Sequence, residues 1–346
     1  MKLHSLRIVL LVILIAGLAA YVGSQSKPAS ILTFLAQNVG LNKDQIAGVQ
    51  NGKPAALNIK SRIPDEVFVF GAVYINAEPE EYVKLATDIG RLSKLSEYLA
   101  VGRFSNPPQV SDLKNFDLDP DDIAALKKCK PGDCMLQMPS KGMELFQKSV
   151  NWSAPDVNRQ VNDLLKKETV QRLIDYQKGG NAILGEYNDK KNPSKVAEQF
   201  KYMISYSKIL PAYLPGFYNY LLTYPNGKPA NVEDTFQWSK VKFGLKPTLR
   251  VTHFVMMRGS SPDEPAYVIA EKQLYSSHYF ETALDLTFCI RDPKRPGFYL
   301  VKVMGSEQAG LTGFKGSIVR KSAVGRSVSS LEKSLASVKT ILESKK

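Results

Sequence analysis

The sequence has few of the residues from which metal centres and disulfide-rich scaffolds are built. Its 346 residues include three cysteines and three histidines, and one histidine, His4, lies in the N-terminal leader. A structural metal site takes about four Cys or His ligands at close spacing, and the sequence has no such cluster. Motifs such as Gly-x-Ser-x-Gly and His-Glu-x-x-His are missing as well. We therefore expect no metal, no cofactor and no common hydrolase site.

A hydrophobic run long enough to cross a membrane is also lacking. The apolar run at 8–22 follows a basic segment that ends at Arg7 and precedes small residues, and it is shorter than the roughly 20 residues of a spanning helix. This pattern is typical of a secretory signal. Residues 1–24 are interpreted as a signal peptide or, if uncleaved, as an N-terminal anchor. We expect an exported protein, in the periplasm or anchored in the inner membrane and facing the periplasm.

Acidic residues are outnumbered by basic ones. The chain has 46 Lys and Arg against 33 Asp and Glu, which gives a formal charge of +13. Because the basic residues are scattered and not gathered in a block, a basic but soluble surface is the simplest interpretation. For an exported protein the alternative partner is an anionic membrane surface, and nucleic acid is not expected. The oligomeric state is left open.

Two of the cysteines flank a turn. Cys129 and Cys134 enclose Lys-Pro-Gly-Asp, and a reversal at Pro-Gly can bring two Cα atoms within disulfide distance. We expect this pair to be bonded in an oxidising compartment. Cys289 lies in an apolar, strand-like run and is interpreted as a small buried side chain.

The C-terminal part of the chain contains successive strand-like runs. They are rich in β-branched and aromatic residues, and turn residues such as Gly259-Ser-Ser-Pro-Asp263 separate them. This pattern predicts an antiparallel meander with strands at 249–257, 266–274, 280–290 and 298–304. An earlier β-rich run at 67–75 precedes Glu78-Pro-Glu-Glu81, which is typical of the first turn of a helix.

A long amphipathic helix is predicted after the meander. From Val324 onward, apolar residues recur in alternating steps of four and three, as on one side of an α-helix. They stand at 324, 328, 331, 335, 338 and 342. The predicted fold class is therefore α+β, a curved antiparallel sheet with one long C-terminal helix across it. Such a pair encloses either a solid core or a cavity for an apolar ligand, and both remain open.

The rest of the chain is divided by composition. Residues 25–65 are predicted to form an N-terminal arm, with a capping box from Asn42 to Gln45 that opens a short helix. Residues 66–344 are predicted to form one α+β domain with a helical insertion at about 155–225. The acids between Asp117 and Asp122 lack the Gly and Glu of a calcium loop, and are interpreted as caps of a helix at 123–128.

This order of elements resembles the helix-grip fold of START-like lipid-transfer and polyketide-cyclase-related domains. The residues that carry the resemblance are 67–75 with Asn76-Ala-Glu-Pro-Glu-Glu-Tyr-Val83, the strands at 249–304, the approach Gly310-Leu-Thr-Gly-Phe-Lys-Gly316 and the final helix. The resemblance implies a hydrophobic cavity closed by that helix, with Gly310, Gly313 and Gly316 as a gate. The chain is also similar to exported bacterial proteins with the same Cys-x-Pro-Gly-Asp-Cys turn and Phe-Gly-Leu-Lys-Pro segment, a likeness that implies no activity.

Ligand contacts follow from the idea of a cavity, in which a few polar groups orient the ligand between apolar walls. His253 alternates with apolar residues and is expected to face the interior, and His278 lies at a break between strands. The predicted ligand-binding residues are Trp238, His253, Tyr275, His278, Phe280, Leu284 and Phe288. A hydrogen-bonded structural role is the alternative for each histidine, and Glu271 and Lys302 are equally well interpreted as solvent charges. Alternation does not decide which face of the sheet meets the last helix.

Three functions are compatible with these patterns. The first hypothesis is a non-enzymatic carrier of a hydrophobic ligand, such as a lipid, in the bacterial envelope. The second is an enzyme of the cyclase or hydrolase type that uses His253 or His278. The third is an envelope scaffold with a solid core.

Overall fold

The structure is a computed structural model that describes residues 30–205, 207, 209–243, 246–308 and 310–344. The predicted signal peptide or anchor at 1–24 lies outside these residues. In the described part of the chain, no helix is both long enough and apolar enough to cross a membrane.

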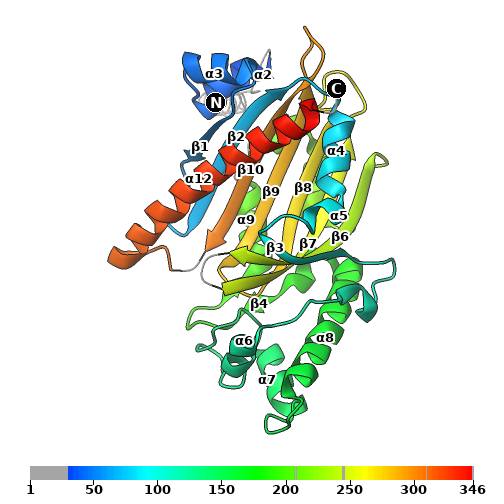
Figure 1. Ribbon diagram of the computed structural model, residues 1–346, viewed down its shortest axis with the longest axis vertical. Coiled ribbons are helices and arrows are strands. Elements are labelled where there is room, and N and C mark those ends of the chain that lie inside the picture. Colours follow the sequence, from blue (N-terminus) through cyan, green and yellow to red (C-terminus); the bar gives the residue numbers. More distant parts are fainter. Residues whose placement is uncertain (1–29, 206, 208, 244–245, 309, 345–346) are drawn as a thin grey trace, which may run out of the picture.

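The centre of the molecule is one antiparallel sheet, to which eight strands of the described residues belong. Its strand order is β1-β2-β10-β9-β8-β7-β6-β3, so the first long strand, β2, pairs with the last, β10 (Figure 1). The strands are β1 (Ala55–Ile59), β2 (Glu66–Ile75), β3 (Tyr98–Arg103), β6 (Val232–Phe243), β7 (Lys246–Arg258), β8 (Tyr267–Ser276), β9 (Phe280–Arg291) and β10 (Phe298–Gln308). The fold is α+β, and the predicted strand at 67–75 and the predicted meander are confirmed.

Helices stand before, between and after the strands. A short two-stranded pair, β4 (Glu186–Tyr187) and β5 (Ser194–Lys195), lies among those between β3 and β6. The α-helices are α2 (Ile31–Phe34), α3 (Lys43–Gln50), α4 (Pro79–Thr87), α5 (Ile89–Leu92), α6 (Pro120–Leu126), α7 (Ser140–Ser149), α8 (Val157–Gly179), α9 (Val196–Ser205), α10 (Ile209–Tyr213), α11 (Pro215–Thr223) and α12 (Gly313–Glu343). The other helical turns are η1 (Leu35–Val39), η2 (Val110–Leu113) and η3 (Gly180–Leu184). The helical region between β3 and β6 therefore begins well before residue 155.

The long helix α12 covers one face of the sheet, which we call the α12 face. It lies across β1 and β2 and touches α4. Leu331, Leu335 and Leu342 of the predicted apolar stripe are buried there, against β2 and β10 residues such as Val73 and Leu300. The prediction of a long C-terminal helix is confirmed, but the helix begins at Gly313 and not near Val324. Its first turns project beyond the sheet (Figure 1), so no apolar stripe marks them in the sequence.

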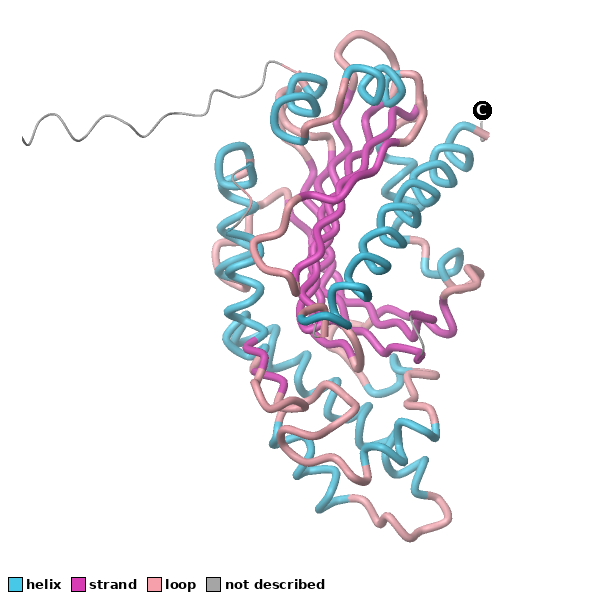
Figure 2. The backbone as a smooth tube through the Cα atoms, turned by 90° about the vertical axis from the view of Figure 1, so that its left-hand side faces the viewer, coloured by secondary structure: helices cyan, strands magenta, loops and turns pink. Residues whose placement is uncertain are grey.

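The opposite face is covered by the helices that connect β3 to β6 and by the N-terminal arm. Figure 2 shows the sheet between α12 on one side and these helices on the other. Phe200 and Met203 of α9 pack with Val255 of β7 and Leu284 of β9 in the largest apolar cluster of the described residues. Because both faces are covered, β2 is buried at every position and does not alternate as a one-sided strand would.

Local predictions in the loops are also confirmed. Asn42 and Gln45 form the predicted capping box at the start of α3. Cys129 and Cys134 form a disulfide with a Cα–Cα distance of 4.5 Å, and Cys289 is buried within β9. Three strands of the eight-stranded sheet, β1, β3 and β6, were not predicted, nor was the short pair β4 and β5. The alternation of Phe236 and Trp238 with polar neighbours was a usable signal for β6.

Candidate functional site

A row of polar side chains crosses the α12 face of the sheet beside α12. Strand register places them together, because Gln237 lies opposite Thr252 and Glu271 lies opposite Asp285 and Phe254. Phe254 belongs to the apolar cluster under α12, which identifies the face. We call this row the polar strip, and its members are Gln237, Arg250, Glu271, Gln273, Asp285 and Lys302.

Two carboxylates stand side by side in the middle of the polar strip. Glu271 of β8 and Asp285 of β9 are direct partners in the antiparallel ladder. Like charges in this position destabilise a sheet, since directly opposed Cβ atoms are only about 5 Å apart. Lys302 of β10 pairs with Thr287, two residues along β9 from Asp285, so it is a diagonal neighbour of Asp285 on the same face. The arrangement is unfavourable unless something else compensates it.

The charged groups of the polar strip are not paired with one another. Within the part of the chain that the structure describes, the side chains of Glu271, Asp285 and Lys302 make no hydrogen bond and no ion pair. Three buried atoms of the polar strip also lack a partner there: Gln237 Nε2, Arg250 Nε and Gln273 Oε1. Gln273 is only 2% exposed, and its Nε2 donates to the carbonyl of Phe280 at 3.0 Å. Unpartnered polar groups of this kind are rare inside folded proteins.

The charges of the polar strip act on one another across short gaps. Burial and then the charge of Glu271 raise the pKa of Asp285 to about 6, although Lys302 and Arg250 oppose the rise. The pKa of Lys302 is raised by Tyr82, while burial opposes this and Glu271 and Asp285 add to it. At neutral pH the polar strip therefore holds opposite charges in a partly desolvated place. Perturbed carboxylates in a hollow are a common sign of a functional site.

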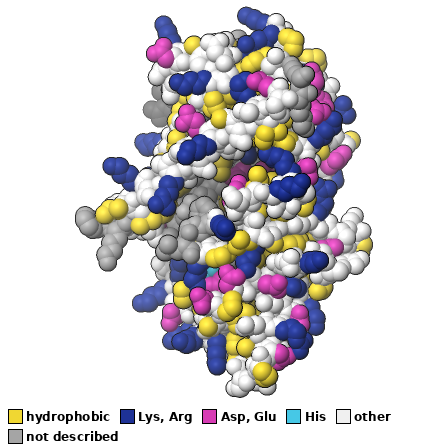
Figure 3. Space-filling model, in the orientation of Figure 1, with side chains coloured by type: hydrophobic (Ala, Val, Ile, Leu, Met, Phe, Trp, Pro, Cys, Tyr) yellow, Lys and Arg dark blue, Asp and Glu magenta, His cyan; other side chains and the backbone are white. Residues whose placement is uncertain are grey.

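The surface of the molecule is hollowed beside α12 (Figure 3). Figure 3 shows a hollow beside α12, with basic and acidic side chains gathered around it. Arg250, Glu271, Asp285 and Lys302 are half-buried, so solvent reaches them although they stand on the sheet. We call this hollow the groove. The same face carries half-buried apolar residues that pack against the cluster under α12: Val83, Ala86, Met256, Met304, Val324 and Val328.

A second depression lies at the start of α12. It has a volume of about 620 Å³ and is lined by Pro64, Leu311, Thr312, Gly313, Ser317, Arg320, Lys321 and Val324. Of the predicted gate residues, Gly310 and Gly313 have left-handed φ angles of 85° and 73°, which glycine adopts without strain. Gly316 lies inside α12, and a Cβ there would come within 2.6 Å of the Leu311 backbone. The role of the three glycines as a gate stays a prediction.

On the face opposite α12, His253 lies in a linear chain of hydrogen bonds. Its Nδ1 is 3.0 Å from the hydroxyl of Tyr176, and its Nε2 is 2.8 Å from Asp234 Oδ1. Lys272 donates to the same Tyr176 hydroxyl at 3.1 Å. Burial lowers the pKa of His253 to about 4, although Asp234 opposes the shift. A neutral imidazole fits these contacts, because Nδ1 can accept from Tyr176 while Nε2–H donates to Asp234.

The ring of His253 and its partners Tyr176 and Lys272 are shielded from solvent. His253 and Lys272 are each 1% exposed and Tyr176 is 2% exposed. The ammonium of Lys272 lies 3.9 Å from the centre of the Phe200 ring, and burial lowers its pKa well below the usual value. The contacts join β7 and β8 to α8 and α9, so their evident effect is to fix the helical region on the sheet.

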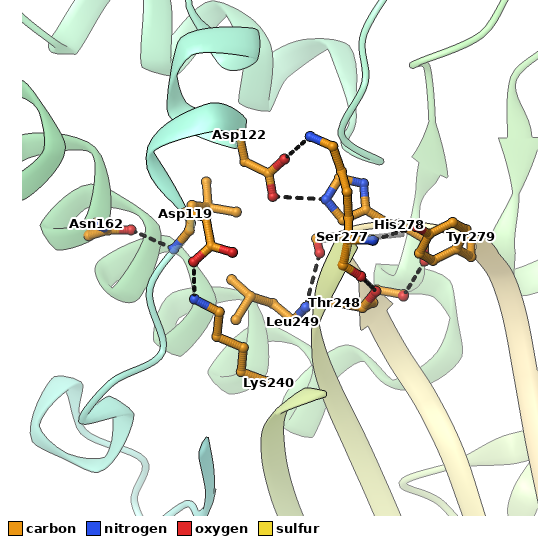
Figure 4. A network of polar contacts seen from close by, with 12 residues as sticks. Asp119, Asp122, Asn162, Lys240, Thr248, Leu249, Ser277, His278 and Tyr279 are labelled. Atoms are coloured by element: carbon orange, nitrogen blue, oxygen red, sulfur yellow. Dashed lines mark hydrogen bonds and ion pairs between the residues drawn. The ribbon is translucent and has the colours of Figure 1, made fainter. Parts of the chain in front are cut away.

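His278 forms a second polar cluster, at the turn between β8 and β9 (Figure 4). Its Nε2 lies 2.9 Å from Asp122 Oδ2, and Lys246 donates to Asp122 Oδ1 at 2.6 Å. Burial acts to raise the pKa of Asp122, but the hydrogen bonds from His278 and Lys246 hold it below its usual value. The neighbouring Ser277 hydroxyl accepts from the backbone N–H of Leu249 at 3.0 Å. The cluster ties α6 to the end of the sheet.

The interpretation of the acids at 117–122 as helix caps was wrong for two of them. Asp119 stands at the N-cap of α6, but its side chain makes no capping hydrogen bond and instead pairs with Lys240 at 2.5 Å. Asp122 is directed to His278 and Lys246, as described above. Both partners are more than 100 residues away along the chain, so a local sequence pattern does not reveal them.

Most residues predicted to line a cavity lie on the face opposite α12. His253 and Leu284 are buried there, and Trp238 donates from Nε1 to the carbonyl of Asp112 at 2.8 Å. Tyr275 and Phe288 are half-buried and pack against the same cluster, while His278 stands at its edge. Phe280 is half-buried, with the Arg250 guanidinium 5.7 Å from its ring centre. The predicted set is therefore not gathered around one hollow, and its role in ligand binding stays a prediction.

The members of the polar strip were not predicted as a site. Glu271 and Lys302 were interpreted as possible solvent charges, and they are half-buried on the α12 face. A signal was present, because charged residues stand inside strands whose other positions are apolar. In a sheet covered on both faces, a charged side chain at such a position is costly unless it has a partner or a function. The comparisons add nothing to this, since no protein-family model and no curated protein matches the chain.

Proposed function

We propose that the protein is a non-enzymatic carrier that binds an amphipathic ligand in the groove. The observation that carries the proposal is the polar strip, whose charged groups have no protein partner within the described residues and border an apolar cluster. A ligand with a polar end and an apolar body complements both parts, and binding sites of this kind combine apolar walls with a few placed polar groups.

The arrangement of the strands supports this proposal. From β2 onward the chain runs through α4, α5, β3, β6 to β10 and α12, and α12 crosses the sheet beside the strand that opened it. This order is the one expected for a helix-grip domain, in which the last helix lies over the ligand. We propose the helix-grip relationship on this basis, with the helical region between β3 and β6 as an addition to it.

Export to the bacterial envelope belongs to the same proposal. The leader at 1–24 has the pattern of an export signal, and a disulfide such as Cys129–Cys134 persists in an oxidising compartment. An envelope carrier would meet lipids as its most abundant amphipathic ligands.

The buried histidines give less support to an enzyme. His253 and His278 are 1% and 6% exposed, and each is bonded to a carboxylate. A general base must come within hydrogen-bond reach of its substrate, and neither ring borders the groove. The carrier is therefore the function that the geometry favours.

Analysis of co-purified lipid tests the proposal. The full chain is isolated from a bacterial membrane fraction and extracted for mass spectrometry, alongside a variant with Lys302→Met and Glu271→Gln. We expect about one amphipathic molecule per wild-type chain and a several-fold lower amount in the variant. The matched control is Glu332→Gln, at an exposed position of α12 away from the groove. A wild-type protein that is folded but carries no lipid, and takes up none from vesicles, contradicts the carrier function.

A further inference from the structure

The unpartnered groups of the polar strip include both hydrogen-bond donors and acceptors, and Gln237 and Gln273 stand in one row on either side of Thr252. Two of the buried atoms that lack a hydrogen-bond partner, which we call orphan atoms, are the donors Arg250 Nε and Gln237 Nε2. The third, Gln273 Oε1, is an acceptor, as are the unpaired carboxylates of Glu271 and Asp285. Arg250 is four residues before Phe254, the partner of Glu271, which places its backbone roughly 13 Å along the strand from the acidic pair. Gln237 is nearer, because its partner Thr252 is only two residues from Phe254.

The charges of the polar strip balance in sum but are not paired. Glu271 and Asp285 carry two negative charges when both are ionised, and Lys302 and Arg250, which both act on Asp285, carry two positive charges. None of the four forms an ion pair among the described residues. One cation and one anion, held a short distance apart, would complete the polar strip.

We infer that the polar end of the ligand is a zwitterion, an ammonium linked to a phosphate or carboxylate. The ammonium lies between Glu271 and Asp285 with Gln273 Oε1 as a third acceptor, and the anion accepts from Arg250 and Gln237. The inference rests on the proposed carrier function and adds the class of ligand. It gives the opposed carboxylates a compensating partner, because a cation between them removes their mutual repulsion. It also gives each orphan buried atom a hydrogen bond.

The alternative is that water alone solvates the polar strip and no specific ligand binds there. Water serves half-buried charges well, and it gives no preference between ligands. A zwitterionic ligand predicts a preference that depends on the acidic pair. The two alternatives therefore differ in a measurable quantity, the ratio of affinities for lipids with and without an ammonium.

Lipid transfer between vesicles measures that ratio. The full chain is given donor vesicles that contain either labelled phosphatidylethanolamine, a zwitterion, or labelled phosphatidylglycerol, which has the phosphate without the ammonium. For the wild-type chain we expect about tenfold faster transfer of the zwitterionic lipid, which corresponds to about 1.4 kcal/mol. The variant with Glu271→Gln and Asp285→Asn is expected to lose this preference. Arg250→Gln is expected to slow transfer of both lipids, because both present the phosphate.

Controls separate loss of recognition from loss of folding. Glu332→Gln lies on the exposed side of α12 and should behave as the wild-type chain. Each variant is compared by circular dichroism and by its midpoint of thermal unfolding, and the amide replacements retain the size of the acids. If the acidic double variant fails to fold, Glu271→Gln alone, with the same two lipids, takes its place.

The outcomes distinguish this inference from the carrier function. Equal transfer of both lipids, by wild type and acidic variant alike, overturns the zwitterion and leaves the carrier standing. Absence of transfer and of any co-purified lipid overturns both. Calorimetry with soluble glycerophosphoethanolamine identifies the source of the ligand: tight binding of this headgroup alone supports a free zwitterion, and binding only of the whole lipid supports a lipid headgroup.

Discussion

Polar groups lie on both faces of the sheet, and the two sets differ in how they are satisfied. On the face opposite α12, His253 and its neighbours are sealed, and each polar group has a protein partner. On the α12 face, Glu271, Asp285 and Lys302 are half-exposed and lack any partner within the described residues. Buried polar groups with partners fix a structure, whereas polar groups left without them are available to something that binds. The first set therefore explains how the helices are held, and the second indicates where a ligand would lie.

The largest effect is expected from removal of a buried partner. Asp122→Ala leaves His278 buried without its carboxylate and Lys246 without its counter-charge. Since breaking a buried pair on one side costs about 3–5 kcal/mol, we expect a loss of about 3 kcal/mol in the free energy of unfolding. Guanidinium denaturation, followed by circular dichroism, measures this loss as a shift in the midpoint, provided that the dependence of the unfolding free energy on denaturant is unchanged.

Asp119→Ala is the matched control for that variant. Asp119 stands at the start of the same helix, but its pair with Lys240 is more exposed, so its loss should cost no more than about 1 kcal/mol. Equal losses for the two substitutions would contradict the structural role given to the Asp122 cluster.

Acid is expected to lower the stability of the protein through His253, on the face opposite α12. Because burial lowers the pKa of His253 from 6.5 to about 4, the unfolded chain binds a proton more readily than the folded one between these values. Stability is then fully present above about pH 6.5 and falls as the pH decreases towards 4, by about 2–3 kcal/mol in total. Unfolding midpoints measured from pH 7.5 to pH 4 test this. His253→Gln should flatten that part of the profile, and an unchanged slope in this variant would assign the effect to other groups.

A glycine in β2 tests how firmly α12 is packed. A Cβ at Gly71 would come within 2.8 Å of side-chain atoms of both Leu331 and Leu335. We expect Gly71→Ala to cost about 1–3 kcal/mol, since overpacking forces such side chains from their rotamers. Gly325→Ala, in the same helix, meets nothing within 4 Å and should stabilise by about 0.5–1 kcal/mol. Thermal unfolding of both variants checks the opposite signs, and a neutral Gly71→Ala would mean that α12 is held loosely on the sheet.

The smallest change in stability, and the most informative, is expected in the polar strip. Neutralising Glu271 and Asp285 removes a like-charge pair from directly opposed positions. Without ligand, the variant should differ from the wild type by no more than about 1 kcal/mol, because the loss of this repulsion is offset by the loss of the acids' attraction to Lys302. Chemical denaturation of the delipidated protein measures this, and a loss of 2 kcal/mol or more would show that the acids serve the fold after all.

The sequence predicted the strands and helices better than it predicted which face of the sheet each helix covers. The strands β7 to β10 and the stripe of α12 were found because alternation, turn residues and steps of three and four are local properties. Alternation also placed His253 and Arg250 on opposite sides of β7, as the register has them. It did not say which side α12 covers, because that depends on helices more than 50 residues away in the sequence. The residues predicted as ligand walls lie mostly on the face opposite α12, and their role in ligand binding stays a prediction.

Other features needed contacts that no local window contains. The pairing of β1 and β3 with the edges of the sheet is set by neighbours distant in sequence. The polar strip likewise depends on register, since Glu271 and Asp285 become neighbours only when β8 and β9 pair in one alignment. A single irregularity between Val251 and Thr252 further shifts the phase of β8 relative to β7, and periodicity alone does not reveal it.

The helical region between β3 and β6 interrupts the order of the strands, yet it is not a removable attachment. Its side chains supply much of the largest apolar cluster, and the sheet supplies the rest, including Trp238, Val255 and Leu284. A shortened chain that joins β3 directly to β6 would leave that whole face exposed and aggregate. A change in size on one side of this shared core therefore requires a compensating change on the other side.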